Sequence, residues 1–263
     1  MSYAAVARIA FQTQLAYRSQ LWAHIFGQFI QVYFKIAIWQ SVYRGQARVD
    51  GVSLPEMITY AVLAGTVLSA WEWPRLIQAI DTAVTTGDVS VFLLKPMGYP
   101  SYLLATECGH LGFRLAAVVL PIVTTIVLYY GMLPPASVFH GAMFVVFWAL
   151  SFLILFLLSM AFGLLAFWLM TAFSLEWLLQ GLLTLLSGSF VPLWFFPDSL
   201  ALVVRQLPFA WVGFYPVAVY LGKLRPPEVW VALGFGLGWA ALLSLGVAAL
   251  WRRATLRITV QGG

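Results

Sequence analysis

Six apolar stretches, each long enough to cross a lipid bilayer, constrain the fold of this chain more than any other feature. We expect the membrane-spanning helices at residues 21–43, 57–73, 102–130, 138–170, 174–194 and 229–251. Only 9% of the residues are charged and 62% are hydrophobic, whereas about a quarter of a soluble domain is charged. Lipid must therefore be the solvent for most of the chain. The sequence predicts an all-α polytopic membrane protein.

The distribution of basic residues indicates which way the chain faces. Six spans place both termini on one side of the membrane. With cytoplasmic termini, the inner segments hold seven Arg and Lys residues and the outer segments five. Trp251-Arg252-Arg253 also forms a sharp stop on the inner side. We expect both termini in the cytoplasm, and we expect no secretory signal because the first twenty residues are too polar.

The segment before the first span, residues 1–20, has the spacing of an amphipathic helix. Val6 and Ala10 fall on one side of such a helix, and Arg8 and Gln12 fall on the other. This pattern predicts a helix lying in the cytoplasmic interface of the membrane. An ordinary frayed terminus is the alternative.

The inner loop, residues 74–100, also shows helical spacing. Ile77, Ile80 and Val84 share one face, and Asp81 and Thr85 lie away from it. Two interpretations stay open at this point. The helix is either a docking surface for another protein or a loop helix packed on its own bundle.

A second, shorter helix is expected later in the same loop. Gly87 is a typical helix end, and Asp88 is a typical start for a helix that reaches Leu94. Lys95 suits the C-terminus of that helix, and Pro96 stops it.

The outer segment before the last span is apolar but rich in proline. Pro192, Pro197, Pro208 and Pro216 forbid one continuous spanning helix. Short re-entrant or interfacial helices are expected within residues 195–228, because irregular backbone at membrane depth needs cover from protein or water.

Ionisable residues inside the spans are candidates for function, because they are costly to place in lipid. Lys35 lies in the first span, and Glu107, His110 and Arg114 share one face of the third. These four residues are a candidate lining for a translocation path. The alternative is that they reach the inner interface or bind a neighbouring helix.

Motifs of catalysis and nucleotide binding are missing from the sequence. There is no GxxxxGK[ST] loop, no HExxH and no GxSxG. His24, His110 and His140 are far apart in sequence and do not predict a metal site. The net charge of +5 is spread along the chain, so nucleic acid is not an expected partner.

Three local patterns, in order, carry a resemblance to a known family. The first is Tyr17-Arg18 ahead of the first span, with Trp39 near its end; the second is TGDVSVFLLKP, residues 86–96; the third is SGSFVPLWFFPDSL…LPF, residues 187–209. Together they resemble the permease of type-2 ABC exporters, and most closely the daunorubicin-resistance-type bacterial permeases. Val89 departs from the larger aliphatic residue that is more common at its position.

The resemblance implies roles for particular residues. The inner loop would be a coupling helix that contacts an ATP-binding subunit through Asp81, Val84, Thr85, Gly87, Asp88, Phe92, Leu93, Leu94 and Lys95. An interface helix carrying Arg8, Gln12 and Arg18 would lie beside it. A re-entrant hairpin would be shaped by Gly188, Pro192, Pro197 and Pro208.

The resemblance also implies an assembly and an activity. Two permease chains, identical or homologous, would work with two ATP-binding subunits in a bacterial cytoplasmic (inner) membrane. ATP and Mg would bind in the partner, and no cofactor is expected in this chain. The complex would export an amphipathic drug, lipid, peptide or glycan by alternating access.

Two other functions are weighed against this one. A secondary transporter or channel not coupled to ATP would show ionisable groups at the midplane and often an internal repeat, and no convincing repeat is visible. A membrane-embedded enzyme would need convergent polar groups, and the nine acidic residues form no recognisable pair.

Overall fold

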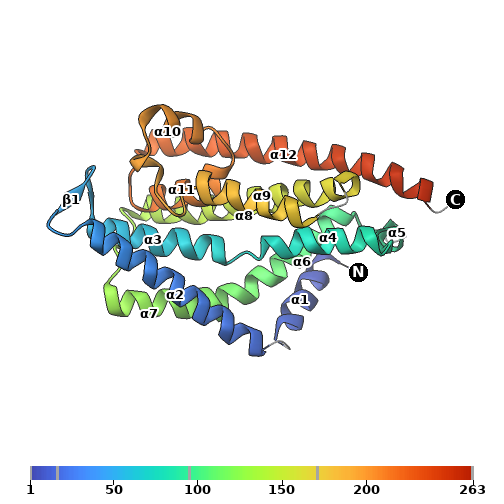
Figure 1. The fold of residues 1–263 in the computed structure, drawn as a ribbon, viewed down its shortest axis with the longest axis horizontal. Coiled ribbons are helices and arrows are strands. Elements are labelled where there is room, and N and C mark those ends of the chain that lie inside the picture. The colour runs from blue at the N-terminus through green and yellow to red at the C-terminus, as the bar shows by residue number, and fades with distance from the viewer. Residues whose placement is uncertain (1, 16–17, 94–95, 170–171, 262–263) are drawn as a thin grey trace.

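The computed structural model describes residues 2–15, 18–93, 96–169 and 172–261, and these residues are almost entirely helical (Figure 1). The predicted all-α fold is confirmed. The α-helices are α1 (Tyr3–Gln14), α2 (Arg18–Val42), α3 (Leu54–Ser69), α4 (Trp73–Thr85), α5 (Asp88–Leu93), α6 (Tyr99–Arg114), α7 (Leu120–Tyr130), α8 (Val138–Leu169), α9 (Ala172–Leu186), α10 (Asp198–Val204), α11 (Phe209–Tyr220) and α12 (Pro226–Gln261).

Three short elements complete the chain. β1 (Arg48–Val49) and β2 (Val52–Ser53) form a small antiparallel hairpin between α2 and α3. A π-helical turn, η1 (Leu115–Val119), joins α6 to α7, and a 3-10 turn, η2 (Leu193–Phe195), precedes α10.

Length and composition identify spanning helices within the described residues. Three helices are long and apolar enough to cross a membrane: Tyr99–Tyr130, which comprises α6, η1 and α7, then Val138–Leu169, and Pro226–Leu256 within α12. α10 and α11 meet at 105° and would make a fourth if they count as one broken span. The chain is thus a multi-pass helical membrane protein, and the number of six spans stays a prediction.

α8 is the central helix of the bundle. It contacts α4, α9, α11 and α12, and side chains on every side of it are buried, including Phe147, Ile154 and Leu164. Its sequence is apolar all round, which is the pattern of a buried helix. Gly163 permits close approach of α4, since a Cβ there would lie 2.7 Å from Cδ1 of Ile80.

The long helix Tyr99–Tyr130 matches the predicted span but is not uniform. Pro121 lies in its second half and has no backbone N–H to donate to the preceding turn. The chain passes through the π-helical turn η1 just before this proline, which lets the helix continue with a wider turn.

α12 packs through the small residues that recur on one of its faces. Ala232 and Ala240 are buried, and a Cβ on Gly236 would overlap the ring of Trp211 in α11. Nε1 of Trp211 donates a hydrogen bond to the carbonyl oxygen of Ala232 over 3.0 Å. These small residues therefore serve packing within the chain.

The termini lie toward the same end of the molecule. Figure 1 shows the N-terminus, α5 and the C-terminus at one end of the bundle, with the β1–β2 hairpin and α10 at the opposite end. We call these the terminal end and the hairpin end.

Candidate functional site

The terminal end carries α1, which lies against α6. Val6 and Ala10 of α1 are buried, and a Cβ on Gly109 of α6 would collide with the backbone of Ala7. Arg8 and Gln12 are exposed, on the side of α1 away from α6. The predicted helix is therefore present and docked. The side chain of Arg18 lies outside the described residues.

α4 packs onto the chain's own bundle, as one of the two interpretations of the inner loop predicts. Leu76, Ile77 and Ile80 are buried against α8 and α9. Nε2 of Gln78 donates a hydrogen bond to Oε2 of Glu176 in α9 over 2.9 Å. The exposed face of α4 carries Arg75 and Gln78 and ends in the polar last turn.

The turn from α4 to α5 forms a polar tip. Gly87 has φ +78° and ends α4, as the sequence predicts. Oγ1 of Thr86 donates a hydrogen bond to Oδ2 of Asp88 over 2.8 Å. Thr85, Thr86, Gly87, Asp88 and Ser90 are exposed, and we call residues 85–90 the tip.

The tip is held by two hydrophobic anchors in α5. Val89 is only 1% exposed. The ring of Phe92 packs against Tyr99 and Tyr102 of α6, with centroids 5.1 and 5.0 Å away. Tyr99 in turn stacks on Trp251 of α12 at 4.9 Å, so α5, α6 and α12 are connected.

The remaining residues of the predicted contact divide into two groups. Asp81 and Val84 are half-buried in the last turns of α4, on the way to the tip. The side chain of Leu93, together with Leu94 and Lys95, lies outside the described residues.

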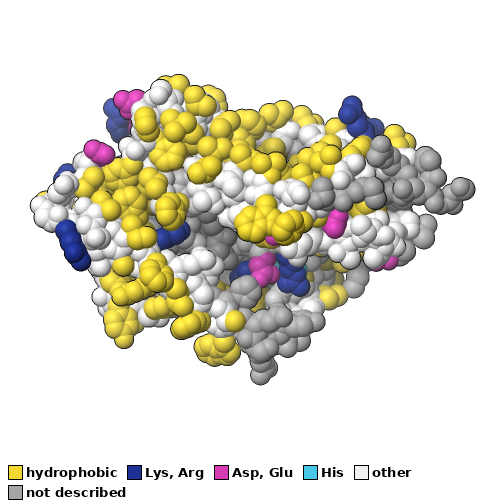
Figure 2. Space-filling model, in the orientation of Figure 1, with side chains coloured by type: hydrophobic (Ala, Val, Ile, Leu, Met, Phe, Trp, Pro, Cys, Tyr) yellow, Lys and Arg dark blue, Asp and Glu magenta, His cyan; other side chains and the backbone are white. Residues whose placement is uncertain are grey.

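The three residues of the predicted polar face of the third span do not share one set of contacts. Nδ1 of His110 lies 3.3 Å from Oε1 of Glu107, whereas Arg114 forms an ion pair with Glu72. Glu72 precedes α4 and also contacts Arg75, over 3.4 Å. Figure 2 shows acidic and basic side chains in a hollow near the middle of a largely hydrophobic face.

The position of this ion pair follows from the order of the helices. Glu72 lies in the break between α3 and α4, and Arg114 is the last residue of α6, next to η1. Figure 1 shows the break between α3 and α4 near the middle of the bundle, between the hairpin end and the terminal end.

Lys35 makes its contacts in a different part of the bundle from that ion pair. Its Nζ donates a hydrogen bond to the carbonyl oxygen of Ser189 over 3.3 Å. Oη of Tyr60 donates to the neighbouring carbonyl of Gly188 over 2.7 Å. Lys35 therefore supports the turn that follows α9, and the described structure does not bring it together with Glu107, His110 or Arg114.

The proline-rich segment forms the turns at the hairpin end. Gly188 has φ +73°, Pro192 is buried directly before η2, and Pro197 and Pro208 directly precede α10 and α11. Each of these residues stands where the chain changes direction. The segment returns into the bundle, since α11 is buried against α3 and α8.

Comparison with known proteins identifies the family to which this chain belongs. A model of the ABC-2 family transporter proteins matches residues 29–262. The chain is a member of the ABC-2 transporter family. No curated protein and no solved structure gives a significant match.

Membership makes the chain an ABC permease, the membrane component of a transporter. Chains of this family are not themselves catalytic and normally work with an ATP-binding subunit. Within the described residues of the permease, no group of three or more His, Cys, Asp and Glu side chains could hold a metal ion.

The sequence analysis does not predict the ion pairs at the hairpin end of the permease. Nζ of Lys223 lies 2.8 Å from Oε1 of Glu56, and Arg225 binds Glu228 over 2.7 Å. Partial burial alone would raise the pKa of the Glu56 carboxyl, but hydrogen bonds from Lys223 and Ser53 hold that pKa below its usual value. The long sequence separation of Glu56 and Lys223 hides their contact from any local pattern.

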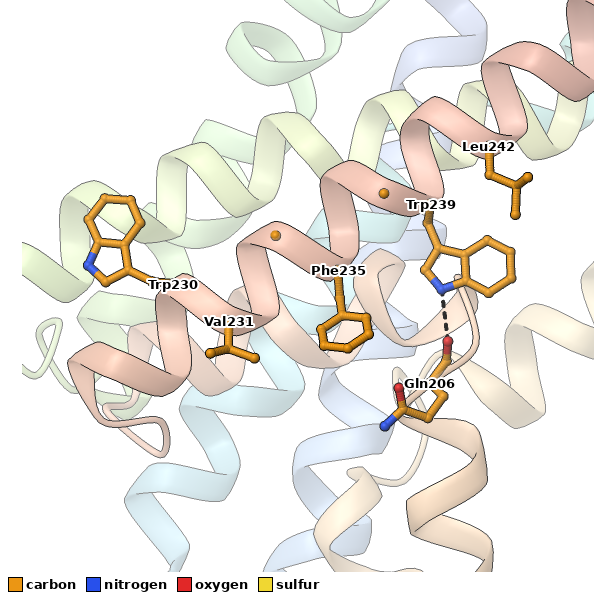
Figure 3. Close-up of a pocket in the computed structure, with 8 residues that line it drawn as sticks. Gln206, Trp230, Val231, Phe235, Trp239 and Leu242 are labelled. Carbon is orange, nitrogen blue, oxygen red and sulfur yellow. Dashed lines mark hydrogen bonds between the residues drawn. The ribbon is translucent and has the colours of Figure 1, made fainter.

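The permease also has an open apolar groove of about 570 Å³ along α12 (Figure 3). Trp230, Phe235 and Trp239 line it, and Gly234 and Gly238 leave open space between them. Nε1 of Trp239 donates a hydrogen bond to the carbonyl oxygen of Gln206 over 2.8 Å. The indole is thus oriented by a neighbouring loop while its ring remains in the groove.

Proposed function

We propose that this permease is the membrane-spanning subunit of an ATP-driven exporter and that the tip, residues 85–90, contacts a separate ATP-binding subunit. One observation carries the proposal. A short polar surface at the terminal end is exposed, while the residues directly behind it are packed into the bundle. An exposed surface on a rigid support suits the transfer of force from a partner.

The packing behind the tip supports a route for that force. Phe92 contacts two tyrosines of α6, and Tyr99 contacts Trp251 of α12. A displacement of α5 would therefore act on two long helices at once. α4 would carry the same displacement to α8 and α9 through Ile77 and Ile80.

The family supports the rest of the proposed assembly. Two permease chains, identical or homologous, would work with two ATP-binding subunits, which would hold ATP and Mg. The permease would lie in a bacterial inner membrane with both termini in the cytoplasm. α1 would lie in the cytoplasmic interface, because its exposed face carries Arg8 and Gln12 and its other face rests on α6.

The proposed cargo class rests on the resemblance to the exporter family. An amphipathic drug, lipid, peptide or glycan derivative suits a bundle with so many exposed aromatic and aliphatic side chains. The groove along α12 adds to this apolar surface and would face lipid or the second permease chain.

Co-purification from the native host tests the contact at the tip. We expect an ATP-binding subunit to accompany the tagged permease in mild detergent. Asp88→Lys should lower its recovery by at least about tenfold, since reversing a charge at a contact costs several kcal/mol. Asp198→Lys, at the hairpin end, is the matched control and should recover the subunit like the unchanged chain.

Two results would refute the proposal. One is the absence of any ATP-binding subunit in the purified material; the other is full recovery with Asp88→Lys. Flux driven by an ion gradient in liposomes without an ATPase would instead favour a secondary transporter or channel.

A further inference from the structure

A pocket of about 470 Å³ at the hairpin end has the chemistry of a binding site. Its volume falls within the range of small-molecule sites. Four segments of the chain line it: the β1–β2 turn, the loop before α10, the loop between α10 and α11, and α11 with the start of α12. Its wall combines aromatic rings with charged side chains, among them Trp194, Arg205, Phe214 and Tyr215.

Two hydrogen-bond donors in this wall have no acceptor. Nε1 of Trp194 and Nε of Arg205 are both buried, and neither has a hydrogen-bond partner among the described residues. Leaving a buried donor unsatisfied costs about 1–3 kcal/mol, and more for a charged group. Two such donors in residues that line one pocket favour a ligand rich in acceptor oxygens, which would pair with them once these side chains turn toward it.

The charges around the pocket favour an anion. Lys223 is bound by Glu56, and Glu228 is bound by Arg225, so these pairs neutralise themselves. Asp50 is exposed on the β1–β2 turn, where water solvates its carboxylate. Arg205 is half-buried, and its guanidinium has no counter-ion among the described residues.

Arg205 is also fixed in place. Its guanidinium carbon lies 5.7 Å from the centroid of the Phe214 ring, within the range of a cation–π contact. Its carbonyl oxygen accepts a hydrogen bond from Oη of Tyr215 over 3.2 Å. The residue is thus held by its backbone and by an aromatic face, while its fork of donors stays available for bidentate binding.

From these contacts we propose that the pocket binds the phosphate or carboxylate headgroup of an amphiphile. Arg205 and Trp194 would donate to the headgroup oxygens, and the rings of Phe214 and Tyr215 would contact the first part of the apolar chain. The proposal refines the cargo class of the proposed function, but binding at this pocket does not depend on an ATP-binding subunit. The amphiphile is either a lipid of the surrounding bilayer or a transported molecule, and both present the same chemistry.

Calorimetric titration of the purified full chain in maltoside detergent tests the site. Dihexanoyl phosphatidate is the probe, and dihexanoylglycerol and inorganic phosphate are the controls that lack the headgroup or the chains. Arg205→Gln should weaken phosphatidate binding by at least about tenfold, the usual value of a charged hydrogen bond. Trp194→Phe, which removes the indole N–H together with the pyrrole part of the ring, should weaken it about threefold or more.

Arg44→Gln is the matched control variant. Arg44 is an exposed cation between α2 and β1, toward the hairpin end, and does not line the pocket. It should change phosphatidate affinity by less than about twofold, as expected for a rim charge. A thermal midpoint for Arg205→Gln within about 2 °C of the unchanged chain would show that the fold is intact.

The same preparation distinguishes the two sources of the ligand, a bilayer lipid and a transported molecule. Anionic phospholipid that co-purifies with the unchanged chain, and is lost with Arg205→Gln, identifies a bilayer lipid. Phosphatidate binding without such co-purified lipid identifies a transported amphiphile. Both outcomes support the site.

Three outcomes would overturn the inference. They are unchanged phosphatidate affinity with Arg205→Gln, an equal loss with Arg44→Gln, and equal affinity for dihexanoylglycerol or inorganic phosphate. None of them bears on the recovery of an ATP-binding subunit, so this site and the proposed function can fail separately.

Discussion

Glu72 and Arg114 link the start of α4 to the end of α6. The side chain of Arg114 is only 11% exposed, so its charge depends on Glu72. Glu72→Gln should lower the free energy of unfolding by about 2–4 kcal/mol, because it leaves a mostly buried guanidinium without its counter-ion. Chemical denaturation in detergent measures this loss.

Arg75→Gln provides the matched comparison for Glu72→Gln. Arg75 contacts the same carboxylate, but its side chain is 48% exposed, so its removal should cost less than about 1 kcal/mol. Equal losses for the two variants would contradict a stabilising role for the buried pair.

Gly188 permits the turn that follows α9. Its φ of +73° disfavours any side chain, and a Cβ would lie 3.0 Å from Cβ of Phe214 and 3.2 Å from Oη of Tyr60. Gly188→Ala should therefore destabilise the permease by about 2 kcal/mol or more, as a lower thermal midpoint. Gly234→Ala, with helical backbone and open space around it, should be neutral or slightly stabilising.

At the residue scale, the sequence identifies costly groups but not their partners. Arg114 is recognisable because it is an ionisable residue in an apolar stretch. Glu72 belongs to a different helix, and helical spacing relates only neighbours within one helix. Glu72 could be recognised in the same way, because it is a charged residue at the end of an apolar stretch, the second predicted span. Arg205, in the loop between α10 and α11, was likewise not singled out.

At the element scale, composition predicts the long helices well and their ends less well. α8 is predicted at 138–170 and found at Val138–Leu169, because its apolar run is uninterrupted. α9 ends at Leu186, short of the predicted 194, because the turn at Gly188 and Pro192 is itself apolar. α12 continues past Trp251 to Gln261, because the arginines that leave the membrane remain good helix formers.

The contact between Glu56 and Lys223 ties the start of α3 to the loop before α12. Because the pKa of Glu56 is lowered in the folded chain, its carboxylate stabilises the fold above the unfolded-state pKa of about 4.3. That stability is lost as the pH falls through the lower folded-state pKa. Both side chains of the pair remain partly exposed, Glu56 at 22% and Lys223 at 27%, so solvent screens the contact and we expect a loss of about 1 kcal/mol or less.

Thermal midpoints between pH 7 and pH 3 measure this dependence. The acid-induced decrease should be smaller for Glu56→Gln than for the unchanged chain. Asp198→Asn, at another exposed acid of the hairpin end, should show the same decrease as the unchanged chain. An identical profile for Glu56→Gln would show that the contact contributes nothing to stability.

At the scale of the whole molecule, function depends on which end faces the cytoplasm. The tip and α1 lie toward the terminal end, and the pocket with Arg205 lies toward the hairpin end. Family membership supports a partner that hydrolyses ATP, and only a cytoplasmic tip could reach it. The distribution of basic residues supports this orientation only narrowly, with seven in the predicted inner segments and five in the outer segments.

Accessibility labelling of single cysteines in cells tests that orientation most directly. Cys108 is exposed and is first replaced by serine. Thr85→Cys and Ser199→Cys then place one thiol in the tip and one in α10, both at exposed positions. A membrane-impermeant maleimide should label Ser199→Cys in intact cells, and Thr85→Cys only after the membrane is permeabilised. Labelling of Thr85→Cys in intact cells would contradict the account.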